Sequence, residues 1–210
     1  MKTNIVFAIT LFFISSCSTL AFWSDDSEEE TSEPVKLKKI QNQYPIDIEW
    51  RRSFDGTNDL GSFVPSFYSG EMIVADPKGN LLSINPNNGK TNWDVNLKRD
   101  LSAGTASGFG KIIVSDANGF VIAIDSVTKE TLWEKNIGGE VLSNGVISAS
   151  LVLLKNSVGE LVALESATGE QKWSFRSQLP ALTVRGTGEP IIENGTVFST
   201  FDNGRMGAFQ

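Results

Sequence analysis

The chain offers few side chains that could carry catalysis or hold a metal. It contains no histidine and one cysteine, Cys17. The commonest general base and the commonest zinc ligand are therefore missing, and neither an intramolecular disulfide nor a CxxC pair can form. Asp116 and Asp125 fall in expected turns, where a carboxylate commonly accepts hydrogen bonds from backbone amides. These observations indicate no metal or cofactor site, and they make Asp116 and Asp125 poor candidates for a general base.

The residues before Cys17 form a pattern that is typical of an export signal. Lys2 supplies a positive charge, and residues 5–14 form an apolar run that is shorter than the roughly 20 residues needed to span a bilayer. Residues 14–17, Ile-Ser-Ser-Cys, resemble the lipobox of bacterial lipoproteins. This resemblance implies that residues 1–16 are a signal peptide and that Cys17 is the lipidated first residue of the mature protein, with palmitate among its acyl chains.

Two other interpretations of Cys17 stay open. The segment could be an ordinary secretory signal with an incidental cysteine, or Cys17 could be buried in a core. Ser18 follows Cys17 in place of an aspartate, and by resemblance to enterobacterial sorting this favours the periplasmic face of the outer membrane. Several acyl chains would form a stable anchor, because each buried methylene contributes about 0.8 kcal/mol.

Residues 17–40 are predicted to form the lipidated cysteine and a disordered acidic tether. Residues 24–33 (SDDSEEETSE) are polar and lack any apolar periodicity, so they cannot bury enough surface to fold. The formal net charge of −7 argues against a nucleic-acid partner, because phosphate binding needs a surplus of lysine and arginine.

A repeat with a period of 40 residues organises residues 41–210. Its two landmarks recur at identical spacing: Gly79, Gly119 and Gly159, and then Trp93, Trp133 and Trp173. In each copy, two β-branched runs flank a turn that ends in the glycine, and a third run carries the tryptophan. A further strand is expected before each set, at about 62–67, 102–107 and 141–147.

Four short strands in each 40-residue unit predict a β-propeller blade. We therefore expect an all-β fold, a β-propeller of four-stranded antiparallel blades, with about four blades present and the ring incomplete. Trp50 marks the end of an earlier copy of the repeat. Blades repeat until the ring closes, so the sequence is expected to be part of a longer chain, with the pairing of two halves as the alternative.

One copy of the repeat is specific enough to suggest a superfamily. Ala123, Ile124, Asp125, Thr128 and Trp133 form a pattern that resembles the tryptophan-docking repeat of the pyrroloquinoline-quinone-type propellers. The resemblance implies that each repeat tryptophan packs between neighbouring blades against a glycine-containing turn, so the tryptophans and glycines are structural. The superfamily includes dehydrogenases, and a fragment of a periplasmic quinoprotein dehydrogenase is therefore the alternative function.

An insertion interrupts the repeat between Phe175 and Pro190. Residues 178–188 (QLPALTVRGTG) resemble the LxLRG-type loop of the BamB family, lipoproteins of the outer-membrane β-barrel assembly machinery. The resemblance implies an eight-bladed propeller whose loop residues Leu182, Val184 and Arg185 bind the periplasmic POTRA domains of a BamA-like barrel-forming subunit.

The same resemblance implies that the protein is not an enzyme but a non-catalytic scaffold that assists the folding and insertion of outer-membrane proteins, with unfolded outer-membrane proteins as further partners. For the loop, the alternative is a strand in which Leu182 and Val184 face inward and Arg185 is solvated. For the protein, a third alternative is a lipoprotein propeller that binds a polysaccharide or a cell-wall enzyme.

Overall fold

The computed structural model describes residues 36–39, 44, 46–54, 61–183 and 188–210. The chain divides into two compact units, Met1–Ile46 and Asp47–Gln210. The predicted signal peptide and Cys17 lie outside the described residues, and so does most of the predicted tether. No described helix is long and apolar enough to cross a membrane.

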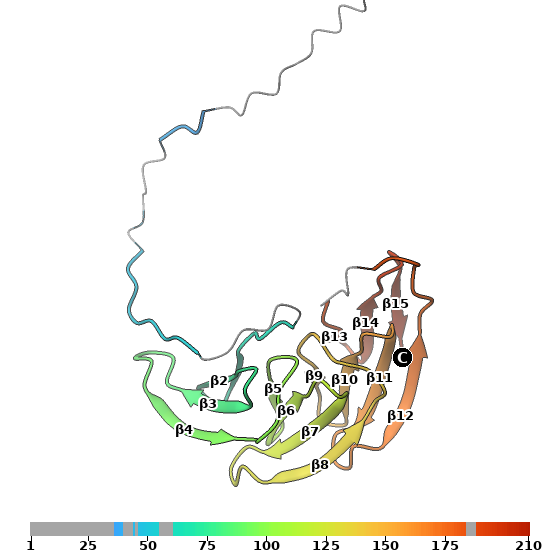
Figure 1. The fold of residues 1–210 in the computed structure, drawn as a ribbon, viewed down its shortest axis with the longest axis horizontal. Helices are drawn as coiled ribbons and strands as arrows, with labels where there is room; N and C mark the ends of the chain where they lie inside the picture. The colour runs from blue at the N-terminus through green and yellow to red at the C-terminus, as the bar shows by residue number, and fades with distance from the viewer. Residues whose placement is uncertain (1–35, 40–43, 45, 55–60, 184–187) are drawn as a thin grey trace, which may run out of the picture. The chain divides into compact units, whose positions relative to one another are not determined.

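Antiparallel sheets make up the second unit, as the repeat predicts (Figure 1). Three sheets have four strands each and the fourth has three, and within each sheet the strands follow the order of the sequence. The first sheet contains β1 (Ser66–Tyr68), β2 (Glu71–Ala75), β3 (Asn80–Ile84) and β4 (Thr91–Asn96). The second contains β5 (Ala106–Gly108), β6 (Lys111–Ser115), β7 (Phe120–Asp125) and β8 (Thr131–Asn136). The third contains β9 (Val146–Ile147), β10 (Leu151–Lys155), β11 (Glu160–Glu165) and β12 (Gln171–Arg176), and the fourth contains β13 (Ile191–Glu193), β14 (Thr196–Thr200) and β15 (Met206–Phe209).

The first strand of each sheet begins later than the sequence predicts. Residues 62–65 and 102–105 were expected to be strand, but they precede the strands, and the backbone groups of Ser62 and Gly104 bond outside their own blades. The N–H of Gly104 donates to the carbonyl of Ser62 at 2.8 Å, and the N–H of Ser62 donates to the carbonyl of Leu142 at 2.8 Å. Ser62 therefore connects the first blade to both the second and the third, whereas the expected ladder would have stayed within one blade.

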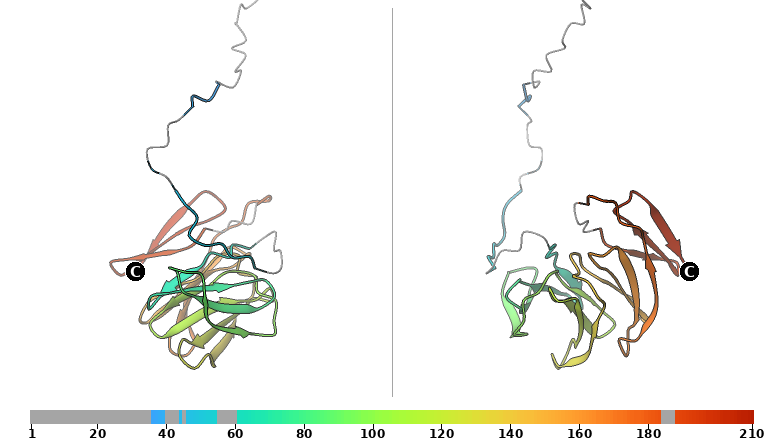
Figure 2. Two further views of the ribbon diagram at one scale, coloured as in Figure 1. Left: turned by 90° about the vertical axis from the view of Figure 1, so that its left-hand side faces the viewer. Right: turned by 45° about the vertical axis from the view of Figure 1, so that its right-hand side comes forward.

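The central strands are buried on both faces, which explains their continuous apolar runs. Ile112 and Ile113 are adjacent in β6 and point to opposite faces, because side chains alternate along a strand. Ile112 packs in a cluster with residues of the first sheet, and Ile113 packs in a cluster with residues of the third sheet. A third cluster joins the third and fourth sheets through Leu153, Leu161 and Val197. Successive sheets thus pack face to face, each pair enclosing its own core (Figure 2).

The repeat glycines occupy the turns between the second and third strands. Gly79, Gly119 and Gly159 have φ of +83°, +85° and +78°, a region that glycine enters without steric cost. A Cβ at Gly119 would also lie 2.9 Å from the backbone of Gly139. In the same turn, Asp116 accepts hydrogen bonds from the backbone amides of Asn118 and Phe120, so its carboxylate serves the turn.

Trp50 and Trp133 pack against a different pair of glycines, Gly89 and Gly169. The indole N–H of Trp50 donates to the carbonyl of Pro86 at 2.8 Å, and that of Trp133 donates to the carbonyl of Ser166 at 3.0 Å. A Cβ at Gly89 or Gly169 would lie 2.8 or 2.6 Å from these two rings. Each tryptophan therefore lies on the turn between the third and fourth strands of the next blade, not on the turn that holds Gly79, Gly119 or Gly159.

Trp93 differs, because Lys129 stands where the other copies have a glycine. Lys129 has φ of +64°, and its Nζ lies 4.1 Å from the centroid of the Trp93 ring, a cation–π contact. The indole N–H of Trp93 donates to the Glu71 carboxylate of its own sheet at 3.2 Å. Trp173, in the third sheet, stacks on Phe209 with the ring centroids 5.7 Å apart.

The contact between Trp133 and Gly169, which joins the second blade to the third, yields a prediction about stability. Gly169→Ala adds a methyl group 2.6 Å from the Trp133 ring at φ of +74°. Gly110→Ala is the matched control, because Gly110 has φ of +76° and nothing lies within 4 Å of its missing Cβ. We expect the control to lower the free energy of unfolding by about 1 kcal/mol and Gly169→Ala to lower it by about 2–4 kcal/mol, because overpacking adds to backbone strain.

Chemical denaturation of the two variants and the wild type measures this difference. If both variants lose the same free energy of unfolding, the contact of Trp133 with Gly169 does not stabilise the packing of the second blade against the third.

Candidate functional site

The insertion lies between the third and fourth sheets. After β12 the chain continues through Ser177 to Thr183, and the description resumes at Gly188, before β13. Leu182 is 91% exposed and lies outside any strand, which does not fit the alternative of an inward-facing strand residue. Val184 and Arg185 lie outside the described residues. Of the three predicted docking residues, the structure thus places Leu182 alone, on the surface.

The turn between β14 and β15 holds the first part of the insertion. The hydroxyl of Thr183 donates to the carboxylate of Asp202 at 2.5 Å. The side-chain amide of Asn203 donates to the hydroxyl of Ser177 at 2.9 Å, and the Asn203 carbonyl oxygen accepts from the backbone amide of Arg205 at 3.1 Å. The insertion is therefore attached to the fourth sheet at Ser177 and again at Thr183.

Asn144 links the last part of the insertion to the first two blades. Its side-chain amide donates to the carbonyls of Val64 and Thr105 at 2.8 and 2.9 Å, and the residue is 7% exposed. Its backbone amide donates to Glu189, two residues before β13. Loss of solvent raises the pKa of the Glu189 carboxyl, and the hydrogen bond from Asn144 acts in the opposite direction. Asn144 thus connects three blades and the residue that follows the insertion.

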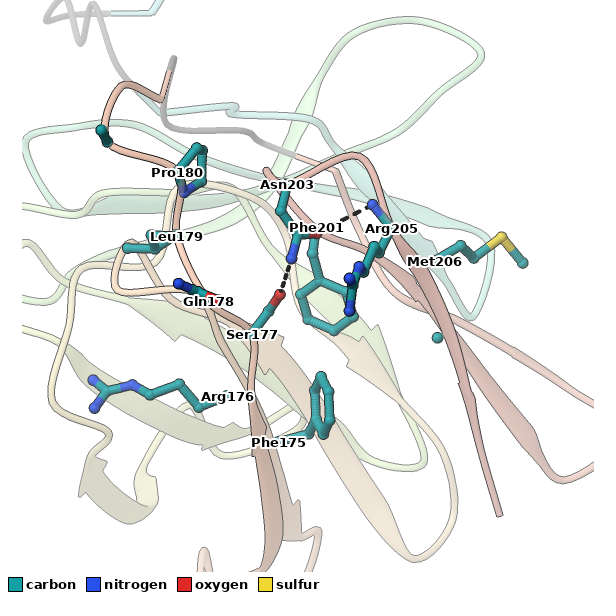
Figure 3. Close-up of a pocket in the computed structure, with 12 residues that line it drawn as sticks. Phe175, Arg176, Ser177, Gln178, Leu179, Pro180, Phe201, Asn203, Arg205 and Met206 are labelled. Carbon is teal, nitrogen blue, oxygen red and sulfur yellow. Dashed lines mark hydrogen bonds between the residues drawn. The ribbon is translucent and has the colours of Figure 1, made fainter.

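A cleft of about 560 Å³ lies beside the start of the insertion (Figure 3). Phe175 and Phe201 form its aromatic part, with their ring centroids 5.4 Å apart. Arg176 and Arg205 also line the cleft, and Figure 3 shows Arg176 extending away from Phe201. Aromatic rings beside arginines are typical of surfaces that bind other proteins.

The cleft lacks the groups that acid–base or metal chemistry would need. Its described lining residues include no aspartate, glutamate or cysteine, and the hydroxyl of Ser177 is already bonded to Asn203. In the described parts of the chain, no group of three or more potential ligands could hold a metal ion. Asp125 accepts from the backbone amides of Thr128 and Val127, which lower the pKa of its carboxyl, so it too serves a turn.

Asn144 yields a prediction, because one of its two acceptors, the carbonyl of Thr105, is buried. Asn144→Ala removes the donor from the carbonyls of Val64 and Thr105 and should lower the free energy of unfolding by about 2–3 kcal/mol. The control is Asn136→Ala, which removes two exposed bonds, one to the carbonyl of Asn118 and one from the backbone amide of Gly138, and should cost less than about 1 kcal/mol because water can replace both. Urea denaturation compares the variants, and a loss at Asn144 no larger than that at Asn136 would contradict the linking role.

Comparison with known proteins supports the resemblance seen in the sequence. Residues 50–210 match the family model described as outer membrane protein assembly factor BamB. A protein of that name from Kangiella koreensis is 44% identical over 185 residues, which cover 87% of this chain and 48% of the relative. Another from Nitrosomonas eutropha is 30% identical over 110 residues, which cover 48% of this chain and 26% of the relative.

A solved structure has the same fold. The crystal structure of BamB from Moraxella catarrhalis matches with a TM-score of 0.64 and 21% identity, covering 72% of this chain and 46% of that one. The chain thus spans about half the length, or less, of the relatives that it matches. Because the family model covers well over half of the residues, the chain belongs to the family of outer membrane protein assembly factor BamB.

Proposed function

We propose that the protein is a non-catalytic scaffold of the outer-membrane β-barrel assembly machinery. In this role it docks on the periplasmic domains of a BamA-like barrel-forming subunit and assists the folding and insertion of outer-membrane proteins. Membership of the BamB family supports this proposal, since its relatives are named as assembly factors. The same names favour a scaffold over a quinoprotein dehydrogenase.

One observation carries the proposal: an exposed segment between two packed blades presents an apolar side chain to solvent. Leu182 is 91% exposed on a segment that is bonded to the fourth sheet at Ser177 and Thr183. Leu182 follows Ala181, which lines the neighbouring cleft with Phe175, and an apolar patch of this kind is typical of an interaction surface. Leu182, Val184 and Arg185 together would supply apolar contact area and a multidentate donor.

The neighbouring cleft extends this surface. Leu179 and Pro180 belong to the insertion and also line the cleft, so a partner that contacts Leu182 is adjacent to Phe175 and Arg205. The arginines would favour acidic groups on the partner, which steer encounter as well as stabilise the complex.

The proposed location follows from Cys17. Lipidation at Cys17 would hold the propeller at the periplasmic face of the outer membrane, with residues 18–40 as the tether. Confinement to the membrane surface raises the effective concentration of the scaffold near a membrane-embedded partner without any new contact.

The docking proposal is tested by reversing the charge of one residue. Arg185→Glu should weaken binding of the isolated periplasmic domains of the barrel subunit by at least about tenfold, because it removes a donor and introduces repulsion. Arg51→Glu makes the same charge change at an exposed arginine that is distant from Arg185 in the sequence. This variant should bind as the wild type does. Titration calorimetry of the three proteins measures the affinities, and equal affinity for Arg185→Glu would rule out its role in docking.

The anchor is tested separately. Cys17→Ala should leave the chain in the soluble periplasmic fraction, because the acceptor of the lipid is gone, whereas the wild type should sediment with the outer membrane. Fractionation followed by immunoblotting makes the comparison. Retention of the variant in the outer-membrane fraction, at high salt, would show that the anchor is not a lipid on Cys17.

A further inference from the structure

The third sheet contains a buried lysine where two other repeats have a small residue. Lys155, at the end of β10, is 7% exposed. One and two periods earlier, the same position holds Ser115 and Ala75. Packing between blades therefore does not require a charge here. Because an ammonium loses hydration when it is buried, Lys155 needs polar partners that Ser115 and Ala75 do not.

The side chain of Lys155 extends from the third sheet to the fourth sheet. Its Nζ donates to the carbonyl of Thr200, in β14, at 3.2 Å. Burial lowers the pKa of the Lys155 amine, and the nearby carboxylate of Asp202 acts in the opposite direction. The ammonium therefore interacts with the backbone at Thr200 and with the charge on Asp202, at the end of β14.

The same stretch of the fourth sheet contacts the insertion on both sides of residues 184–187. On one side, Thr183 donates to Asp202. On the other side, a Cβ at Gly188 would lie 3.0 Å from Oγ1 of Thr200 and 3.6 Å from Nζ of Lys155. Thr183 is thus bonded to Asp202, and Gly188 lies close to Thr200 and Lys155.

We propose that Lys155, Asp202 and Thr183 are positioning residues that hold residues 177–183, which carry Leu182, in their binding geometry before the partner arrives. Lys155 orients the Thr200–Asp202 stretch from the third sheet, Asp202 holds Thr183, and Thr183 fixes the adjacent Leu182. Fixing a segment in its bound conformation raises affinity, because less conformational entropy is lost on binding. The inference rests on the proposed function, since it concerns how the segment binds.

Three substitutions test this arrangement in the full chain. Lys155→Met keeps the length of the side chain and removes the ammonium. Thr183→Val keeps the shape and removes the hydroxyl, whereas Thr183→Ser retains the hydroxyl. Lys172→Met is the control, because Lys172 is an exposed lysine of the same sheet that pairs with Glu165.

We expect Lys155→Met and Thr183→Val each to weaken binding of the periplasmic domains of the barrel subunit by about three- to tenfold, the loss that one positioning hydrogen bond produces. Thr183→Ser and Lys172→Met should bind as the wild type does. Amide hydrogen exchange should become faster within residues 178–190 in the two weakened variants, and nowhere else. The melting temperature of Lys155→Met should change little, because the lost bond to Thr200 is offset by removal of the desolvation cost of the ammonium.

Two results would overturn the proposal. One is unchanged exchange within residues 178–190 in both Lys155→Met and Thr183→Val. The other is a fall in melting temperature of Lys155→Met with faster exchange throughout the third sheet, which would assign Lys155 to packing. If the wild type itself does not bind the domains, the docking function fails, and the exchange measurement still decides whether these residues fix the segment.

Discussion

The structure depends on the burial of apolar strand faces between successive sheets. No sheet can cover both of its own faces, so β6 and β7 of the second sheet are buried only because the first and third sheets pack against them. Two aromatic rings add to this packing, because Trp50 and Trp133 each lie on a turn of the following blade. This packing fixes the spacing of the blades and therefore the position of the segments that connect them, including the insertion.

Much of this fold could be predicted from the sequence, because each blade repeats the same pattern of strands and turns. The common spacing of Gly119 and Trp133 with their counterparts predicts the turns and the outer strand, and the antiparallel four-stranded sheets are confirmed. The predicted start of the first strands was wrong, because backbone groups of Ser62 and Gly104 bond between blades. The arrangement of Trp93 with Lys129 was also missed, because it depends on which residue the next blade offers.

The candidate site could be predicted only in part. A break in the period identified the insertion, and the exposure of Leu182 agrees with a surface role, whereas Val184 and Arg185 stay predictions. Lys155 could have been found by comparing positions one period apart, since a lysine replaces Ser115 and Ala75. The same comparison singles out Asn144, which replaces Gly104 and Val64, but it does not give the partners of Asn144, because Val64 and Thr105 lie in two other blades.

The central claim is that the segment around Leu182 is the surface that meets the barrel-assembly subunit. Site-specific photocrosslinking in living cells tests it most directly. A photoreactive residue at Leu182 is predicted to capture the periplasmic domains of that subunit, and one at Val127, 83% exposed on the turn between β7 and β8, is predicted not to. Equal capture at the two positions, or capture at Val127 alone, would contradict the account.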